Sequence, residues 1–440
     1  MNADAQRPEP PPAYRWAVLL FISLAMFGNY YLYDTIAPVA DLMKSQLGFT
    51  DEHIGLLYSA YSWGAILILL PGGVFIDRYG TRKGTMLFGS ICAVAGFLTV
   101  ASDDLYVMLA GRFMLSAAEP LIVAITAAIA KWFRGKELAF AMGINLTIAR
   151  FGQIAADNSP TWMRAAYSNW RDPLIIGAFL GLTCLLGAVA YWILESRAEA
   201  RYSLGEAGGT DKLVLADIFK FNRSFWFITA LCVAFYSIIF PFRSFAIKFF
   251  IEAHAMTREA GGFQNSFLPL AAMVATPLIG LLTDKIGRRA TLMLFGSLLL
   301  LPVFLMMGYL PSTPAVSLWV PFMGTFVMPA YVLIAVILLG IAFSLIPAIM
   351  WPSVAYIVPQ NRLGSAYALM FLLQQGGIAG LVWLAGVSND YAGAAADNPA
   401  GYLPMLWMFT AVGVLAVFFA LLLWRTETGP RNHGLETLKA

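Results

Sequence analysis

The sequence has little charge. Only 12% of its 440 residues are Asp, Glu, Lys or Arg, whereas 60% are hydrophobic. A chain of this composition cannot bury its apolar surface against itself in water, so a soluble globular protein is excluded and a lipid bilayer is the expected solvent. The apolar runs are too long and continuous for the alternating strands of a membrane barrel, which leaves membrane-spanning helices.

Groups that carry enzymatic chemistry are also scarce. The sequence has no His-Glu-x-x-His pattern, no paired catalytic aspartates and no Gly-x-x-x-x-Gly-Lys-Ser/Thr phosphate loop. These absences argue against an intramembrane enzyme and an ATP-driven pump, and we expect no cofactor and no metal. The few cysteines all fall inside expected helices, which is typical of small packing residues and not of disulfides: they are Cys92, Cys184 and Cys232.

Twelve segments are long and apolar enough to span a bilayer, which takes about 20 residues each. Because Ala290–Gln360 has no charged residue and is too long for one span, we expect Pro311-Ser-Thr-Pro314 to turn the chain and divide it into two helices. The other ten segments are Trp16–Tyr33, Ile54–Ile76, Gly84–Ser102, Leu105–Ala130, Leu138–Ala156, Pro173–Leu194, Ser224–Phe242, Gly261–Thr283, Leu363–Asn389 and Ala400–Trp424.

The expected fold is therefore an all-α membrane protein with twelve transmembrane helices in two pseudo-symmetric six-helix bundles. A polar, glycine-containing segment separates the two halves and is typical of a flexible connector. The expected organisation is a disordered N-terminal tail over 1–14, a first bundle over 15–196, a linker over 197–221, a second bundle over 222–425 and a C-terminal tail over 426–440.

The positions of Lys and Arg predict the orientation. Both termini and the loops on the same side carry most of these residues. Both termini are therefore expected in the cytoplasm, and the net charge of +3 reflects this bias and not a nucleic-acid partner. The opposite loops hold only Lys44, Arg164, Arg171, Lys248 and Arg258.

One polar motif occurs twice, 207 positions apart. The copies are Gly73-x-x-x-Asp77-Arg78-x-Gly80-x-Arg82-Lys83 and Gly280-x-x-x-Asp284-Lys285-x-Gly287-Arg288-Arg289. Each copy forms a short hairpin between two expected spans on the cytoplasmic side. The pair resembles the signature of the major facilitator superfamily, which implies two six-helix bundles that rock around a central site.

A carboxylate at the C-terminal end of a helix is disfavoured by the helix dipole, so both motif aspartates need a positive partner. We expect Asp77 to face the start of the eleventh helix near Arg362, and Asp284 to face the start of the fifth near Lys136 and Glu137. These contacts would close the cytoplasmic side, and the motif glycines would permit close approach. The other gating candidates in the motif are Arg78, Arg82, Arg288 and Arg289.

Glu119 and Arg150 are ionisable residues near the middle of the fourth and fifth helices. Such a group costs about 2.5–3.5 kcal/mol at the bilayer centre, so each needs a partner or a role. They either neutralise each other or bind the ammonium and the carboxylate of a zwitterion, and we favour the second interpretation. Other candidates for substrate contacts are Tyr30, Tyr58, Asn145, Gln153, Trp351 and Gln374.

Asp34 and Arg243 occupy similar outer positions on the first and seventh helices. We expect this pair to help close the non-cytoplasmic gate. The alternative is that each side chain reaches water at the membrane surface separately. Arg112, in the outer third of the fourth helix, is within reach of Asp103 or Asp104 and is expected to be structural.

Several stretches are similar to one branch of the superfamily, the lysosomal dipeptide transporters. This resemblance covers both halves, and in it Glu119 and Arg150 fall on the acidic and basic residues of the substrate site. It implies a uniporter of dipeptides. The matching stretches are Tyr33-Asp34, Tyr58-Ser-Ala-Tyr-Ser-Trp63, Thr81-Arg-Lys-Gly-Thr85, Gly111-Arg-Phe113, Trp132-Phe-Arg-Gly-Lys-Glu-Leu138, Ala149-Arg150, Phe240-Pro-Phe242 and Trp351-Pro-Ser-Val-Ala-Tyr-Ile-Val-Pro359.

The sequence lacks an N-terminal acidic dileucine sorting signal, and its loops are compact. We therefore expect a monomer in the inner cell membrane, without an accessory subunit, rather than a lysosomal protein. The alternative function is a proton-coupled transporter of organic anions or drugs, in which Arg150 binds the anion and Glu119 or Asp34 carries the proton.

Overall fold

The computed structural model describes residues 8–133, 137–204, 220–430 and 432–437. Within them, eleven helices are long and apolar enough to cross a membrane. One of these, α3 (Asp51–Val100), has 50 residues and is interrupted at Gly80, whose φ of 87° and ψ of 164° are not helical. As one unbroken helix of 1.5 Å per residue, 50 residues would extend about 75 Å, more than twice the thickness of the hydrocarbon core, and Gly80 instead divides them into two helices. α3 therefore holds two spans, and the expected twelve are present.

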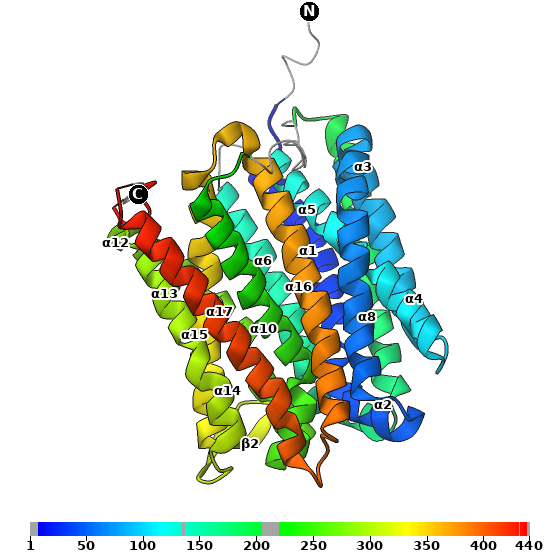
Figure 1. Cartoon of the computed structure of the whole chain (residues 1–440). Coiled ribbons are helices and arrows are strands. Elements are labelled where there is room, and N and C mark those ends of the chain that lie inside the picture. The colour runs from blue at the N-terminus through cyan, green and yellow to red at the C-terminus, as the bar shows by residue number, and fades with distance from the viewer. Residues whose placement is uncertain (1–7, 134–136, 205–219, 431, 438–440) are drawn as a thin grey trace, which may run out of the picture. The chain divides into compact units, whose positions relative to one another are not determined.

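The first half contains α1, α3, a fourth span broken into α4 and α5, α6 and α8 (Figure 1). α1 begins at Pro12, inside the expected tail, because a proline fits the first turn of a helix. The bounds are α1 (Pro12–Asp34), α2 (Ala40–Leu47), α4 (Leu105–Leu115), α5 (Ala118–Trp132), α6 (Leu138–Asp157), α7 (Ser159–Trp162) and α8 (Arg171–Glu199), with short 3-10 turns at Ala37–Val39 and Arg164–Ser168.

The second half has the same number of spans, and two of them are broken. The bounds are α10 (Arg223–His254), α11 (Arg258–Asn265), α12 (Phe267–Ile286), α13 (Arg289–Leu298), α14 (Leu300–Tyr309), α15 (Ala330–Ile357), α16 (Leu363–Tyr391) and α17 (Leu403–Glu427). Short 3-10 turns precede α16 and α17, at Gln360–Arg362 and Pro399–Tyr402.

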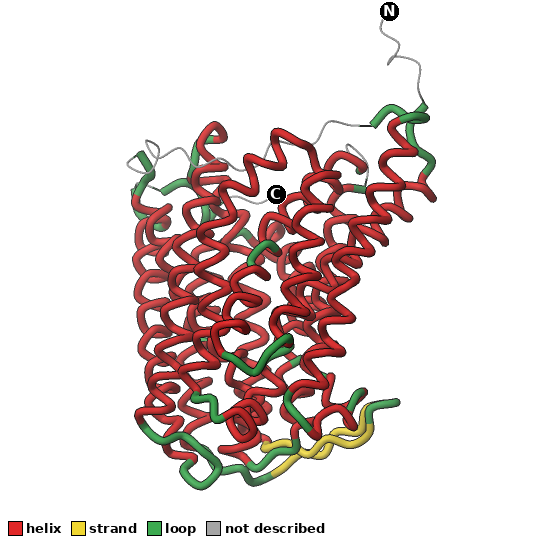
Figure 2. Tube along the Cα trace, turned by 90° about the vertical axis from the view of Figure 1, so that its right-hand side faces the viewer, coloured by secondary structure: helices red, strands yellow, loops and turns green. Residues whose placement is uncertain are grey.

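Two expectations about the second half need correction. The turn between α14 and α15 is longer than Pro311–Pro314, because it continues into an antiparallel hairpin of β1 (Ala315–Val320) and β2 (Gly324–Pro329), seen at one end in Figure 2. A strand in a run without charge lacks the polar alternation that would reveal it. α10 does not end at Phe242 but runs to His254, because Arg243 and Lys248 are buried in this helix and paired with Asp157 and Asp51.

The helices pack into two compact units whose limits do not follow the order of the chain. Unit 1 comprises Met1–Thr35, Trp63–Ala156 and Leu174–Lys212, and unit 2 comprises Ile36–Ser62, Asp157–Pro173 and Leu213–Ala440. Unit 2 thus includes two segments of the first half. In each unit we call the end that carries the motif hairpin the motif end, and the opposite end the far end. Parts of the expected tails and of the linker, at 1–7, 205–219 and 438–440, lie outside the described residues.

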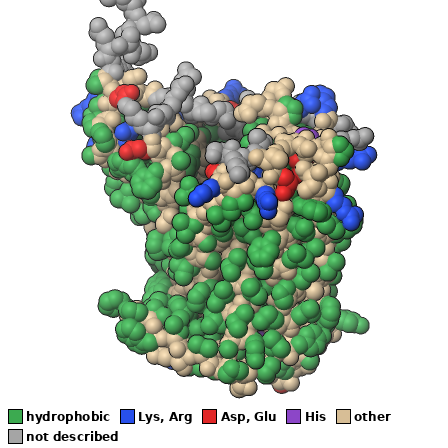
Figure 3. Space-filling view, turned by 90° about the vertical axis from the view of Figure 1, so that its left-hand side faces the viewer, with side chains coloured by type: hydrophobic (Ala, Val, Ile, Leu, Met, Phe, Trp, Pro, Cys, Tyr) green, Lys and Arg blue, Asp and Glu red, His purple; other side chains and the backbone are tan. Residues whose placement is uncertain are grey.

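The surface has the character of a protein that is solvated by lipid. On the face shown in Figure 3, hydrophobic side chains cover much of the surface. On α12, for example, Val274, Leu278 and Leu281 are each more than half exposed. A stripe of this kind on a helix long enough to span a bilayer is suited to acyl chains and not to water.

Candidate functional site

Unit 1 holds five of the residues that the sequence suggested for substrate contacts, and four of them lie together. Arg150 on α6 donates through Nη1 to Oε1 of Gln153 at 2.6 Å, and its guanidinium lies 5.9 Å from the centre of the Tyr30 ring on α1. Tyr30 also interacts electrostatically with Glu119 on α5. One turn before Arg150, Asn145 accepts a hydrogen bond of 2.9 Å from the Ser23 hydroxyl of α1. We call Tyr30, Glu119, Arg150 and Gln153 the unit 1 polar group.

Close packing of α1 on α6 positions this group. A Cβ atom at Gly152 would lie 2.4 Å from the carbonyl oxygen of Phe27, so only glycine allows the two backbones to approach this closely. The Phe27 ring in turn stacks on Tyr31, at a centroid distance of 6.2 Å. The approach at Gly152 therefore brings the guanidinium of Arg150 beside the ring of Tyr30.

Glu119 lies where its helix is irregular. Ser116 and Ala117 donate their N–H groups to carbonyls three residues back, and this tight turn separates α4 from α5. Pro120 contributes to the break because it has no N–H group and its ring crowds the preceding turn. Glu119 therefore belongs to the first turn of α5, where the positive end of the helix dipole stabilises a carboxylate.

Unit 2 holds the other three candidates. Trp351 on α15 donates through Nε1 to the Tyr236 hydroxyl of α10 at 3.0 Å, and its carbonyl accepts from the Tyr367 hydroxyl of α16 at 3.2 Å. Gln374 on α16 accepts a weaker bond of 3.4 Å from the Cys232 thiol. Tyr58 on α3 is buried. Tyr236 was not among the candidates, because an aromatic residue in a span is usually part of the packing.

Arg243 forms a buried ion pair at the far end of unit 2. Its Nη2 atom lies 3.1 Å from Oδ2 of Asp157, and neither side chain is more than 3% exposed. Asn265 joins the pair, because its carbonyl accepts from Arg243 at 3.2 Å and its Nδ2 donates to Asp157 at 2.7 Å. A Cβ atom at Gly262 would lie 2.0 Å from the Asp157 carbonyl oxygen, which shows how closely α11 approaches the end of α6.

The sequence did not identify Asp157 as a partner of Arg243. Asp157 directly follows Ala156, the expected end of the fifth helix, and a polar residue at the end of a helix is common and does not indicate a distant partner. The pairing of Asp34 with Arg243 stays a prediction. Asp34 is the last residue of α1 and is 4% exposed.

Lys248 forms a second buried network at the far end. Its Nζ atom lies 3.0 Å from Asp51, 3.0 Å from Glu252 and 2.6 Å from the Tyr402 hydroxyl. Asp390 at the end of α16 accepts from the backbone N–H groups of Asp51 and of the residue after it, at 2.9 and 2.7 Å, and so caps α3. These bonds tie three segments of unit 2 to the start of α3.

Arg258 joins α11 to the segment after α1. It forms a two-pronged ion pair with Asp41 and also donates to the Pro38 carbonyl at 2.7 Å. Its guanidinium lies 5.4 Å from the centre of the Tyr167 ring. Burial raises the pKa of the Tyr167 hydroxyl, so this group stays neutral and bonds to Ser159.

We call the ion pairs of Arg243, Lys248 and Arg258 the far-end network. A signal for it was present in the sequence, because basic residues are rare opposite the motif hairpins. Four of the five that the sequence places there form ion pairs, namely Lys44 with Asp51, Arg164 with Glu259, Lys248 with Asp51 and Arg258 with Asp41.

The two motif hairpins are held differently. In unit 1, Arg82 donates to Glu199 at the end of α8 at 2.6 Å and lies over the Trp192 ring, at 4.9 Å from its centre. In unit 2, Arg289 pairs with Asp284 of its own hairpin at 2.8 Å and lies 4.8 Å from the Tyr356 ring centre. The contacts expected for Asp77 and Asp284 with the other half stay predictions, and Lys136 lies outside the described residues.

The remaining motif residues serve the turns. The Arg78 guanidinium lies 5.4 Å from the Tyr79 ring centre, and Arg288 adopts a left-handed conformation with φ of 50°. Among the described residues the space around the Cβ position is open at Gly80 and Gly280, and the close approach expected at the motif glycines stays a prediction. Gly80 and Gly287 supply the positive φ angles of 87° and 72° that the hairpins require.

Arg112 contacts the end of α1. Its guanidinium donates to the carbonyls of Leu32 and Tyr33 at 2.9 and 3.0 Å. These belong to the last turn of α1, where carbonyls lack helical partners. The expected partner Asp104 caps its own helix, since it accepts from the N–H groups of Tyr106 and Val107.

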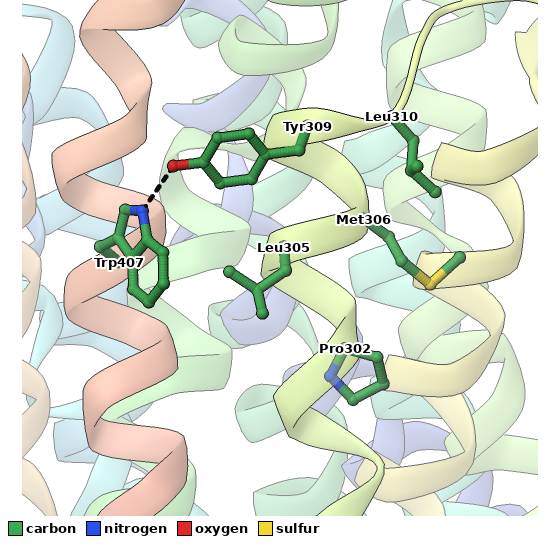
Figure 4. A pocket seen from close by; sticks show the side chains of 6 residues that line it. All are labelled: Pro302, Leu305, Met306, Tyr309, Leu310 and Trp407. Carbon is green, nitrogen blue, oxygen red and sulfur yellow. Dashed lines mark hydrogen bonds between the residues drawn. The ribbon is translucent and has the colours of Figure 1, made fainter.

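A hollow between α14 and α17 is too apolar to hold a zwitterion (Figure 4). Its lining contains no charged residue, and its one internal bond joins Nε1 of Trp407 to the Tyr309 hydroxyl at 2.7 Å. Tyr309 and Trp407 are exposed on two spans, which suits contact with lipid. The lining residues are Pro302, Leu305, Met306, Tyr309, Leu310 and Trp407.

Comparison with known proteins gives a consistent result. The sequence profile of the Major Facilitator Superfamily matches residues 22–382. The chain is 30% identical over 442 residues to the lysosomal dipeptide transporter MFSD1 of Homo sapiens, which covers 96% of this chain and 89% of that protein. It is 31% identical over 429 residues to the same transporter of Danio rerio, covering 93% and 87%.

Solved structures show the same fold. A bacterial homologue of the human lysosomal transporter Spinster, in an inward-facing and occupied conformation, superposes with a TM-score of 0.71. It is 17% identical in sequence, and the superposition covers 95% of this chain and 98% of that chain.

Proposed function

The chain belongs to the Major Facilitator Superfamily, and from this premise we propose that it moves small zwitterionic solutes, above all dipeptides, down their gradient without a coupled ion. It is a multi-pass membrane transporter. The finer assignment rests on the unit 1 polar group, whose chemistry matches the two ends of a peptide. The names of its relatives agree with it.

The observation that carries the proposal is the placement of opposite charges around Tyr30. The planar guanidinium of Arg150 suits a carboxylate, and Glu119 at the start of α5 suits an ammonium. Two ionisable groups inside spans cost about 2.5–3.5 kcal/mol each, a cost that packing alone does not require. We assign the peptide carboxylate to Arg150 and Gln153, and the amino group to Glu119.

The transport cycle we propose is alternating access of the rocker-switch kind. The far-end network would be the closed outer gate, because it ties the outer ends of α3 and α6 to the second half within unit 2. The motif ends would face the cytoplasm, in keeping with their Lys and Arg content. We further propose that the protein acts as a monomer in the inner cell membrane, although two relatives are named as lysosomal.

Uptake into proteoliposomes tests the assignment. The panel comprises dipeptides, single amino acids and dicarboxylates, each measured with and without a pH gradient. We expect dipeptide uptake that follows the peptide gradient alone. Glu119→Gln and Arg150→Ala should each weaken peptide affinity by about ten- to hundredfold, the range for a hydrogen bond to a charged group. Asp397→Asn, in an exposed loop, is the matched control and should be unchanged.

A second candidate function is proton-coupled transport of an organic anion. It is favoured by the position of Glu119 and Asp34, which both interact electrostatically with Tyr30 beside Arg150. One carboxylate would then be available to carry a proton. Accumulation driven by a pH gradient, or uptake of dicarboxylates but not dipeptides, would select this function and reject the uniporter.

A further inference from the structure

The segment after α17 folds back onto the second motif hairpin. The Leu435 carbonyl accepts from the Arg289 N–H group at 2.8 Å, and the Glu436 carboxylate accepts from the N–H group and the hydroxyl of Thr291, at 2.7 Å each. The Thr291 hydroxyl also accepts from Nε1 of Trp424 at 3.1 Å. Figure 1 shows this end of the chain beside the end of α12 and the start of α13.

Glu436 supplies the cap that α13 lacks in its own sequence. The N-cap position of α13 is Arg288, which is left-handed and makes no side-chain cap bond. The first N–H groups of a helix have no partner within the helix, and a carboxylate is favoured there by the dipole. Leu435 and Glu436 satisfy two of these groups from a segment 145 positions away in the sequence.

Glu427 holds the segment in this position. Its side chain is fully buried at the end of α17, where the helix dipole disfavours a carboxylate. Four donors compensate for this: the Ser224 hydroxyl at 2.6 Å, Nδ1 of His433 at 2.9 Å, and the backbone N–H groups of His433 and Leu435 at 2.8 and 3.4 Å. On its other side the His433 ring contacts Asn222 at 3.1 Å. Gly434, with φ of 91°, lets the chain turn toward α13.

Unit 1 contains a comparable device. Its motif hairpin is tied by Arg82 to Glu199, the last residue of α8. In both units, therefore, a carboxylate at or after the last helix of a half holds the motif hairpin of that half.

We propose that residues 432–437 form a clamp that positions the second gating hairpin, with Glu436 as the positioning residue that contacts it and Glu427 as the residue that folds the segment. The clamp must loosen whenever the motif end rearranges, so it sets the rate of that step. This second part rests on the proposed transport cycle. The first part, the positioning of the hairpin, does not.

Hydrogen–deuterium exchange of the full-length protein in lipid nanodiscs tests the clamp without any substrate. Glu436→Ala should speed exchange at residues 288–292 by about 2- to 30-fold, the effect of losing one helix cap. Glu436→Gln keeps an acceptor and should restore much of the protection. Asn432→Ala changes a residue of the same segment whose side chain, within the described part of the chain, bonds to the nearby Gly429 carbonyl alone. Asn432→Ala should leave exchange at residues 288–292 unchanged. At residues 78–84, in the first hairpin, exchange should stay the same in all of these variants.

Transport assays then test the rate. At saturating peptide, Glu436→Ala should raise turnover at least about twofold, the low end for a lost cap, while KM stays the same. Unchanged exchange at 288–292 in Glu436→Ala would overturn the clamp, and faster exchange with unchanged turnover would overturn its role in the rate. If the wild-type protein transports no peptide, the proposed function fails, but the exchange result still decides whether the clamp exists.

Discussion

Lys248 and Asp51 lie 197 positions apart and form an ion pair of 3.0 Å in which neither side chain is exposed to solvent. Lys248 is also bonded to Glu252 and Tyr402, so its three ammonium donors all have acceptors. A buried ion pair tolerates the loss of both charges far better than the loss of one. The Lys248–Asp51 pair therefore fixes which segments meet at the far end of unit 2, and mutation can test it directly.

Removal of one partner should destabilise the protein strongly. Lys248→Met leaves the Asp51 carboxylate buried without its main counter-charge, which costs about 3–5 kcal/mol for a buried pair. The double variant Lys248→Met with Asp51→Asn should recover a large part of this loss. Thermal unfolding in detergent, analysed as a double-mutant cycle, measures the coupling. Additive losses in the double variant would contradict it.

Arg164→Ala is the matched control for that experiment. Arg164 also forms a far-end ion pair, with Glu259 at 2.9 Å, but its side chain is 82% exposed. A pair of this kind contributes about 0–1 kcal/mol because water and salt screen it. The unfolding temperature should therefore hardly change.

The Arg243 pair should control opening of the far end. Asp157→Asn removes the charge that holds Arg243, so the far end should open more often. A cysteine in place of Ser266, next to Asn265, reports this through its reaction with a water-soluble maleimide. We expect labelling about tenfold faster or more, given the cost of breaking a buried pair. Slower or equal labelling would remove Arg243 from the gate.

Charge exchange identifies the functional partner of Arg243. Exchanging Arg243 with Asp157, as Arg243→Asp with Asp157→Arg, should restore transport above the level of either single variant. The same exchange with Asp34 tests the pairing that the sequence suggested. Rescue by both exchanges would mean that Arg243 changes partner during the cycle. If neither exchange restores transport, Arg243 has no gating pair with these carboxylates.

Two motif glycines should respond in opposite ways to alanine. Gly80 has a φ of 87° and a ψ of 164°, a region that is almost closed to other residues, so Gly80→Ala should cost about 1–3 kcal/mol. Gly280 lies within α12 with open space around it, so Gly280→Ala should stabilise the helix by about 0.5–1 kcal/mol. Thermal unfolding measures both. A stable Gly280→Ala that transports slowly would show that close approach occurs in another conformation.

The motif aspartates should affect rate more than affinity. Asp284→Asn breaks the 2.8 Å pair with Arg289, and Asp77→Asn removes the equivalent carboxylate in unit 1. Since neither belongs to the unit 1 polar group, both should change the turnover number of peptide uptake while KM stays within about twofold, as for a residue outside the bound state. A large rise in KM with normal turnover would place these carboxylates in substrate binding.

The spans were predictable because a bilayer imposes a strong and local constraint. About 20 apolar residues in a row have one stable solution in lipid, and α6, α8 and α16 lie within a few residues of their expected bounds. Glu119 and Arg150 were identified as candidates for a related reason, since charged residues are rare in apolar helices. The β-hairpin at Ala315–Pro329 was missed because its residues are as apolar as those of the spans beside it.

The sequence by itself determined which segments lie in the membrane, which superfamily signature they carry and which few charges must be explained there. Only the tertiary structure decided the partners: Asp157 for Arg243, Asp51 for Lys248 and Glu436 for the start of α13. The physical reason is distance along the chain. Whether a segment is buried in lipid depends on residues that are neighbours in the sequence. An ion pair or a helix cap depends on two groups that are far apart in the sequence and are brought together by helix packing.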